Sequence, residues 1–156
     1  MKRSVKYLLF LLLFLGGIVV MSCEKKVRGC TDPDSVTFDE FAEKDDGSCL
    51  YEGRSVIWYN ETASVGLEVD GATALTYYVN GDVVGSSATS VFWPVEPFCG
   101  DDGSITVTED LGNSKRRTYE LSVKDQDGNE YWNVDLILEA NTCLIMELSW
   151  DKRKKK

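Results

Sequence analysis

Residues 117–138 read RTYELSVKDQDGNEYWNVDLIL, and this stretch decides the expected fold. Apolar and polar side chains alternate on both sides of a central turn at 125–128. The alternating apolar residues are Tyr119, Leu121 and Val123 before the turn, and Trp132, Val134, Leu136 and Leu138 after it. Alternation with a period of two places these side chains on one face of a strand. Asp and Gly in the connection favour a turn. We therefore expect strands over 117–124 and 131–138 that each bury one face.

Similar short runs, separated by turns, extend outward from this stretch. They are 54–60, 64–70, 75–80, 82–85, 104–108 and 142–150. In the run 64–70, Val65, Leu67 and Val69 would share a face of a strand. The Asn80-Gly81 pair between two apolar runs is a strong hairpin signal. We find no helical pattern after the first 22 residues, so the sequence predicts a mostly β protein with an antiparallel β-sandwich over 54–150.

The N-terminal residues 1–22, MKRSVKYLLFLLLFLGGIVVMS, have the order of a secretory signal peptide. A basic start precedes an apolar run over 8–21, which at 14 residues is short of the roughly 20 that span a bilayer. The tetrad Val20-Met21-Ser22-Cys23 resembles the bacterial lipobox. That resemblance implies cleavage before Cys23 and attachment of lipid, with palmitate-type acyl chains, to its sulfur. An uncleaved N-terminal anchor helix is the alternative.

Lipid on Cys23 would hold the chain to a membrane, because two or more acyl chains anchor a protein stably. Glu24 follows the cysteine where an inner-membrane retention signal has Asp, which favours the outer membrane. We expect five segments in the precursor. They are a signal peptide over 1–22, a lipid-anchored linker over 23–28, a cysteine-bracketed acidic module over 29–52, the β-sandwich over 54–150 and a basic tail over 151–156.

Reserving Cys23 for lipid leaves four cysteines, an even number that favours two disulfides in an exported chain. Three pairings are open, and we favour Cys30–Cys49 with Cys99–Cys143 because each pair lies in its own segment. Zinc is the rival interpretation, but the spacings are not those of a zinc site.

Residues 29–51 read GCTDPDSVTFDEFAEKDDGSCLY. This segment resembles a short repeat of secreted Bacteroidota proteins, on a Gly-Cys-Thr-Asp-Pro start at 29–33, an aromatic centre, and Asp-Asp-Gly-Ser-Cys-x-Tyr at 45–51. The family's usual Asn-Tyr-Asn-Pro centre is replaced here by residues 37–40. The resemblance implies no assigned activity.

So short a segment cannot bury enough apolar surface without a staple. We expect three aromatic residues, Phe38, Phe41 and Tyr51, to form a miniature core. Its clustered carboxylates are candidate calcium ligands, since calcium takes six to eight oxygens. They are Asp32, Asp34, Asp39, Asp45 and Asp46. The alternative is that these side chains cap turns and face water.

The segment 54–150 also resembles a small exported β-domain of the same bacteria. The resemblance rests on Val79-Asn80-Gly81, on Phe98-Cys99-Gly100 before the run 103–107, on Tyr119, Asp127-Gly128 and Trp132, and on Asn141-Thr142-Cys143. It implies an Ig-like fold, supports the Cys99–Cys143 pair, and implies no catalytic residues.

The charge and composition restrict the function. Setting aside the three bases of the leader and the five at 152–156 leaves nine bases against 26 acids, a net charge near −17. Such a body repels nucleic acid. The chain has no histidine, which removes the usual general base and metal ligand. The basic tail is expected to be solvated, with anionic lipid headgroups or an acidic partner as the alternative.

We expect a lipid-anchored cell-envelope protein that acts as a non-enzymatic binding or structural accessory module, with an envelope protein as its partner. The main alternative is a carbohydrate-binding surface lipoprotein of a glycan-uptake system. Its sugar platform would consist of Tyr59, Trp93 and Tyr131, which fall off the core-facing pattern or in a loop. A small carboxylate hydrolase is a third hypothesis, but no acid pair stands out from the acidic background.

Overall fold

The computed structural model describes residues 25–154, so the predicted signal peptide and the lipidation site Cys23 lie outside the described residues. The strands are β1 (Arg28–Gly29), β2 (Lys44–Asp45), β3 (Tyr51–Trp58), β4 (Ala74–Val79), β5 (Asp82–Ala88), β6 (Ile105–Gly112), β7 (Arg116–Asp125), β8 (Glu130–Glu139) and β9 (Cys143–Glu147). Among the described residues, the helical elements are the α-helix α2 (Glu61–Val69) and the 3₁₀ helix η1 (Trp150–Lys152).

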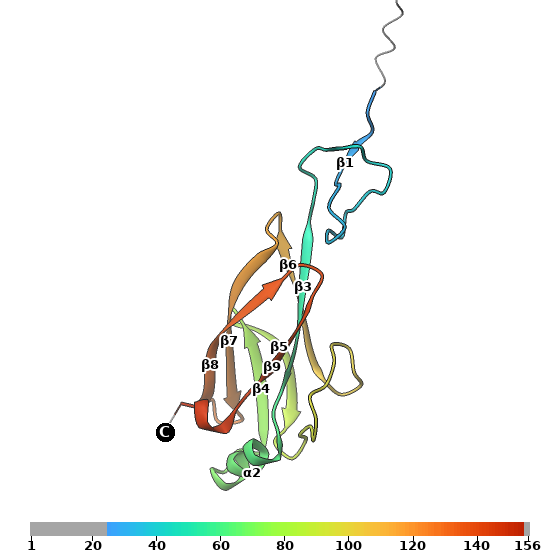
Figure 1. Ribbon diagram of the computed structural model, residues 1–156. Coiled ribbons are helices and arrows are strands. Elements are labelled where there is room, and N and C mark those ends of the chain that lie inside the picture. The colour runs from blue at the N-terminus through green and yellow to red at the C-terminus, as the bar shows by residue number, and fades with distance from the viewer. Residues whose placement is uncertain (1–24, 155–156) are drawn as a thin grey trace, which may run out of the picture.

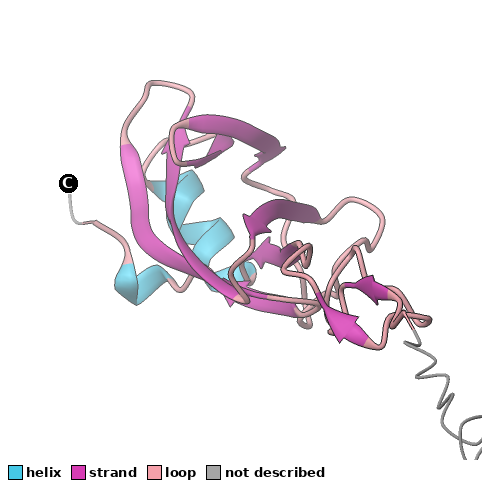
Figure 2. Cartoon of the chain, turned by 90° about the horizontal axis from the view of Figure 1, so that it is seen from above, coloured by secondary structure: helices cyan, strands magenta, loops and turns pink. Residues whose placement is uncertain are grey.

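Strands β3 to β9 form a domain that we call the β-domain. It consists of two sheets that enclose a common core (Figures 1 and 2). One sheet has the order β6-β3-β9 and the other β5-β4-β7-β8. Strands β3 and β9 pair in parallel, and the other neighbours within these two sheets are antiparallel. The mostly β fold is confirmed, whereas the Ig-like assignment stays a prediction.

The core contains the apolar residues that alternation selected. Leu121, Val123, Leu136 and Leu138 are fully buried, and Trp132 is 1% exposed. Strands β7 and β8 pair in register over most of their length, with Leu121 opposite Val134. The same alternation buries Leu75, Tyr77 and Val79 on β4. The two central strands of the larger sheet are therefore positioned by their own patterning.

The segment 61–69 is a helix, so the predicted strand over 64–70 is wrong. Asn60 provides the N-cap, and its side-chain oxygen accepts a hydrogen bond from Ala63 N at 3.1 Å. The buried side chains of α2 follow helical spacing and are Ala63, Ser64 and Leu67. Val65 and Val69, which alternation placed beside Leu67, are 53% and 80% exposed. Within residues 25–154, no helix has the length and apolar composition needed to cross a bilayer.

The helix packs against Trp150 of η1 through Gly66. A Cβ added at Gly66 would lie only 2.3 Å from Trp150 Cε2. The Trp150 ring is also stacked on Tyr131, with centroids 6.4 Å apart, and the Arg153 guanidinium lies over the Trp150 ring, 3.6 Å from its centroid. The helix thus requires glycine at position 66 because the Trp150 ring lies too close to leave room for a side chain.

We predict that Gly66→Ala displaces Trp150 and lowers the free energy of unfolding by about 1–3 kcal/mol, the usual cost of overpacking. The higher helix propensity of alanine would otherwise favour this change. Urea unfolding with tryptophan fluorescence measures both effects. Adding Gly66→Ala to a Trp150→Ala background should cost much less, and equal costs in both backgrounds would contradict the packing described.

The cysteine-bracketed module is a small unit with little regular structure. Strands β1 and β2 pair in parallel, and Cys30 forms an isolated bridge with Phe38. The predicted miniature aromatic core is wrong, because Phe38 and Phe41 are 45% and 73% exposed. The module is too short to enclose two phenyl rings, and the buried Cys30–Cys49 disulfide occupies its interior instead.

Candidate functional site

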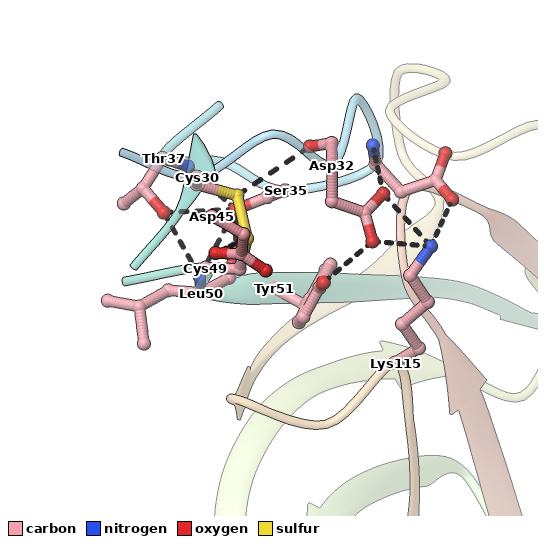
Figure 3. Close-up of polar contacts among 10 residues, drawn as sticks. Cys30, Asp32, Ser35, Thr37, Asp45, Cys49, Leu50, Tyr51 and Lys115 are labelled. Atoms are coloured by element: carbon pink, nitrogen blue, oxygen red, sulfur yellow. Dashed lines mark hydrogen bonds and ion pairs between the residues drawn. A yellow bond between two sulfur atoms is a disulfide. The ribbon is translucent and has the colours of Figure 1, made fainter. Parts of the chain in front are cut away.

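The module is built around the predicted disulfide Cys30–Cys49, which the structure contains (Figure 3). Cys30 and Cys49 are 1% and 8% exposed. Ser35 joins the two ends of the module: its Oγ donates to Leu50 O at 2.7 Å and accepts from Leu50 N at 3.1 Å. The module is thereby closed immediately before β3 begins at Tyr51.

A polar junction connects this module with the β-domain. Tyr51 Oη donates to Asp32 Oδ2 at 2.8 Å (Figure 3). Lys115, between β6 and β7, places its Nζ 2.7 Å from Asp32 Oδ2 and 2.9 Å from Asp34 Oδ2. Its ammonium group also lies 5.7 Å from the centre of the Tyr51 ring. We call this set of four residues the junction network.

The electrostatics of the junction network follow from these contacts. The pKa of Asp32 lies below its ordinary value. The main cause is the hydrogen bond that Lys115 donates to the carboxylate, and the second is the hydrogen bond from Tyr51. The bond to Asp32 in turn raises the pKa of the Tyr51 hydroxyl. Asp32 and Asp34 together raise the pKa of Lys115. These shifts favour the charged forms of Asp32 and Lys115 and the neutral hydroxyl of Tyr51.

A cleft of about 460 Å³ lies beside the junction network. The module contributes Pro33 to Val36 to its wall, and the β-domain contributes Glu52, Arg54, Thr108 and Asn141. These side chains offer hydrogen-bond donors and acceptors with charges of both signs. The cleft is thus suited to a small polar ligand rather than to an apolar one.

The five predicted calcium ligands do not converge. Asp32 and Asp34 bind Lys115, whereas each of the other three accepts a backbone N–H two residues further along the chain. These bonds are Asp39 Oδ1 with Phe41 N, Asp45 Oδ1 with Gly47 N and Asp46 Oδ1 with Ser48 N, at 2.9–3.1 Å. No metal-binding group of three or more acidic, Cys or His side chains occurs in the part of the chain that the structure describes. The arrangement is that of turn-capping carboxylates, and calcium binding stays a prediction.

The predicted sugar platform is wrong for two of its three residues. Tyr59 and Tyr131 are each 2% exposed, and only Trp93 reaches the surface in part. Tyr59 Oη donates to Ala88 O at 3.0 Å and is covered by the segment after β5. Tyr131 is buried because the register of β7 and β8 shifts beside it. The extra residue of this bulge turns inward next to Trp132, which alternation cannot anticipate.

The basic tail is exposed at Lys152 and Lys154, as expected of a solvated end, but two of its residues form ion pairs with the body of the chain. Arg153 forms an ion pair with Asp70 at 3.9 Å, and Lys154 forms one with Glu130. The hydrogen bond from Lys154, assisted by Ser122, lowers the pKa of Glu130 to about 2. Two bases of the tail thus have acidic partners within the same chain. Residues 155 and 156 lie outside the described part.

The fold and junction define a disulfide-stapled, mostly β protein composed of a small module and a two-sheet domain. No family model, curated protein or solved structure matches the chain.

We predict that Lys115→Met raises the pKa of Asp32 toward its ordinary value of 3.8. In the native protein the folded pKa lies below the unfolded one, so the stabilisation from Asp32 is present above the unfolded pKa. It is lost as the pH falls through the folded pKa. Carbon NMR titration of the Asp32 carboxyl measures the change. Lys152→Met, in η1 near the opposite end of the molecule, is the control, and an equal shift in that variant would contradict the assignment.

Proposed function

We propose that this chain is a lipid-anchored cell-envelope protein, held at the outer membrane through Cys23, that acts as a non-enzymatic binding and structural accessory module. Within it, the stapled module would serve as a rigid spacer between the lipid and the β-domain. The lipobox-like tetrad supports the anchor. The arrangement of the two units supports the spacer: the module lies at one end of the β-domain, and helix α2 lies toward the other (Figure 1).

The observation that carries the spacer is the junction network. A flexible linker between two units would let each tumble separately. Here Leu50 leads directly into β3, and Lys115 of the β-domain forms ion pairs with both Asp32 and Asp34 of the module. These contacts limit bending at the point where the module meets the β-domain. Isolated surface ion pairs contribute little stability. In the junction network one lysine contacts two carboxylates and a tyrosine. We therefore propose that the network fixes the orientation of the module relative to the β-domain.

Two measurements test the proposal. Mass spectrometry of the mature protein should find lipid on Cys23, and Cys23→Ala should release the protein from the membrane fraction. Spin labels introduced at Phe41 and Val69, both highly exposed, should give one narrow distance distribution. Lys115→Ala should broaden it, whereas Lys152→Ala should not. An unlipidated Cys23 would overturn the anchor, and a broad distribution in the wild type would overturn the spacer.

A second candidate function, glycan binding, is favoured by the polar cleft beside the junction network. Its lining of carboxylate, guanidinium, amide and hydroxyl groups matches the donors and acceptors of a sugar. A glycan array probed with the mature protein tests it. Binding that is lost in Arg54→Ala would support this function, and an array without signal would exclude it.

A further inference from the structure

The loop that connects β5 with β6 exposes large apolar side chains to solvent. Val95 and Phe98 are 70% and 66% exposed, Val91 is 50% exposed and Phe92 is 36% exposed. We call residues 91–98 the apolar loop; it lies on the side of the β-domain and is yellow in Figure 1. Single exposed apolar residues are ordinary on protein surfaces, but here four occur within eight residues of one loop, and clustered exposed apolar residues mark interaction sites.

The apolar loop is held in one conformation. The backbone N–H of Trp93 donates to Tyr59 O at 3.1 Å, directly after β3. The Cys99–Cys143 disulfide ties the end of the loop to β9. Two prolines within the loop restrict its backbone further. A surface that is ordered before binding loses little conformational entropy when a partner docks.

The apolar loop lies in an acidic stretch of the sequence. Between Ser55 and Ser114 the sequence contains nine acidic residues and no lysine or arginine. Three of the acids lie in the loop or directly after it, and all three are exposed: Glu96, Asp101 and Asp102. Asp101 also fixes the loop, because its Oδ2 accepts a hydrogen bond from Phe98 N at 2.8 Å. The apolar loop and the residues directly after it thus carry three exposed acidic side chains, Glu96, Asp101 and Asp102, which we call the acidic rim.

We propose that the apolar loop is a docking surface for a partner protein whose groove is apolar and bordered by lysine and arginine side chains. The proposal rests on the proposed function, since it names the partner of that accessory module. The apolar side chains would supply most of the affinity, and the acidic rim would set orientation and association rate. An anionic lipid surface and a second copy of this chain are both disfavoured because each would meet the acidic rim with like charge.

Site-specific photocrosslinking in cells that make the full-length chain tests the proposal. A photoreactive benzoylphenylalanine replaces Val95, and the same residue replaces Val69 of α2 as the control, because Val69 is 80% exposed and lies on another element. We expect a discrete protein adduct from position 95 and none from position 69. Phe92→Ser combined with Phe98→Ser should lower its yield by about tenfold or more, the loss expected when hot-spot side chains are removed.

The charge of the rim is tested separately. Glu96→Gln combined with Asp102→Asn should also lower the yield of the adduct, while the melting temperatures of both double variants stay close to that of the wild type. The adduct supports the proposal only if it depends on both the apolar and the acidic residues. An adduct with twice the mass of the chain, a lipid adduct, an adduct unaffected by either double variant, or no adduct would overturn it.

The same cells distinguish failure of this proposal from failure of the proposed function. Membrane fractionation and the mass of the Cys23 peptide report on the anchor independently of the apolar loop. A lipidated, membrane-bound protein without a position-95 adduct would overturn the docking surface and leave the anchor standing. A protein with unlipidated Cys23 would overturn the proposed function, together with the envelope partner that rests on it.

Discussion

Replacement of Trp132 by alanine should lower the free energy of unfolding by about 3–5 kcal/mol, as expected for a large aromatic side chain in a core. Trp132 is 1% exposed on β8, and its ring lies beside that of Tyr131 with centroids 5.9 Å apart. Its Nε1–H donates to Ser149 O at 3.0 Å, so truncation also removes the partner of that carbonyl. Because domains are stable by about 5–15 kcal/mol, the loss is a large share of the total. Urea unfolding followed by circular dichroism measures it.

Val69→Ala is the matched control for this prediction. Val69 is 80% exposed, and its truncation should change the free energy of unfolding by no more than about 0.5 kcal/mol. Trp132→Phe should fall between the two, because it keeps an aromatic ring and loses the bond to Ser149. A loss below about 1 kcal/mol for Trp132→Ala, with an unchanged denaturant slope, would show that the ring does not belong to the core.

Strands β4, β7 and β8 of the larger sheet were predictable because their buried side chains alternate along the chain. Period-two alternation is a direct consequence of the pleat, and it placed Leu121, Leu136 and Trp132 in the core. The Asn80-Gly81 turn was likewise readable, since Asn80 has a φ of 48° and Gly81 a φ of 91°. Both signals are local, so the sequence carries them without knowledge of the rest of the fold.

The helix α2 was missed because Val65, Leu67 and Val69 alternate in the sequence by coincidence. The helical signal was present in Asn60, a good N-cap residue, and in the spacing of Ala63, Ser64 and Leu67. Two of these three are small, so their burial depends on what packs against them. Trp150, which lies against Gly66, comes from the other end of the β-domain sequence, and a local pattern cannot show that contact.

The candidate site divides in the same way. Both disulfides followed from the cysteine count and the segment boundaries, and the structure contains both pairs. Lys115 carried no comparable signal, because a basic residue in a turn is ordinary on any surface. Its role arises only when the β6–β7 turn is brought next to Asp32, 83 positions earlier in the chain. Long-range juxtapositions of this kind are created by the fold and leave no periodic mark.

Removal of the first disulfide, by Cys30→Ser combined with Cys49→Ser, should unfold the module and leave the β-domain folded. The two cysteines are 19 positions apart. On the chain-entropy model a cross-link of this length contributes about 3 kcal/mol. The module has no other large stabilising element, because Phe38 and Phe41 are exposed. Amide NMR spectra should therefore show random-coil shifts for residues 29–48 and native shifts for strands β4 to β8.

The contrast with the second disulfide makes this prediction specific. Cys99→Ser combined with Cys143→Ser removes a cross-link over 44 positions and should lower the free energy of unfolding by about 4 kcal/mol. The β-domain nevertheless keeps its shared core, and the module keeps the Cys30–Cys49 disulfide. Only the first double variant should detach Asp32 from Tyr51 and Lys115, and so return the pKa of Asp32 to its ordinary value. Native shifts in the module of that variant would show that hydrogen bonds such as those of Ser35 suffice to fold it. In that case the disulfide would not be what keeps the spacer rigid.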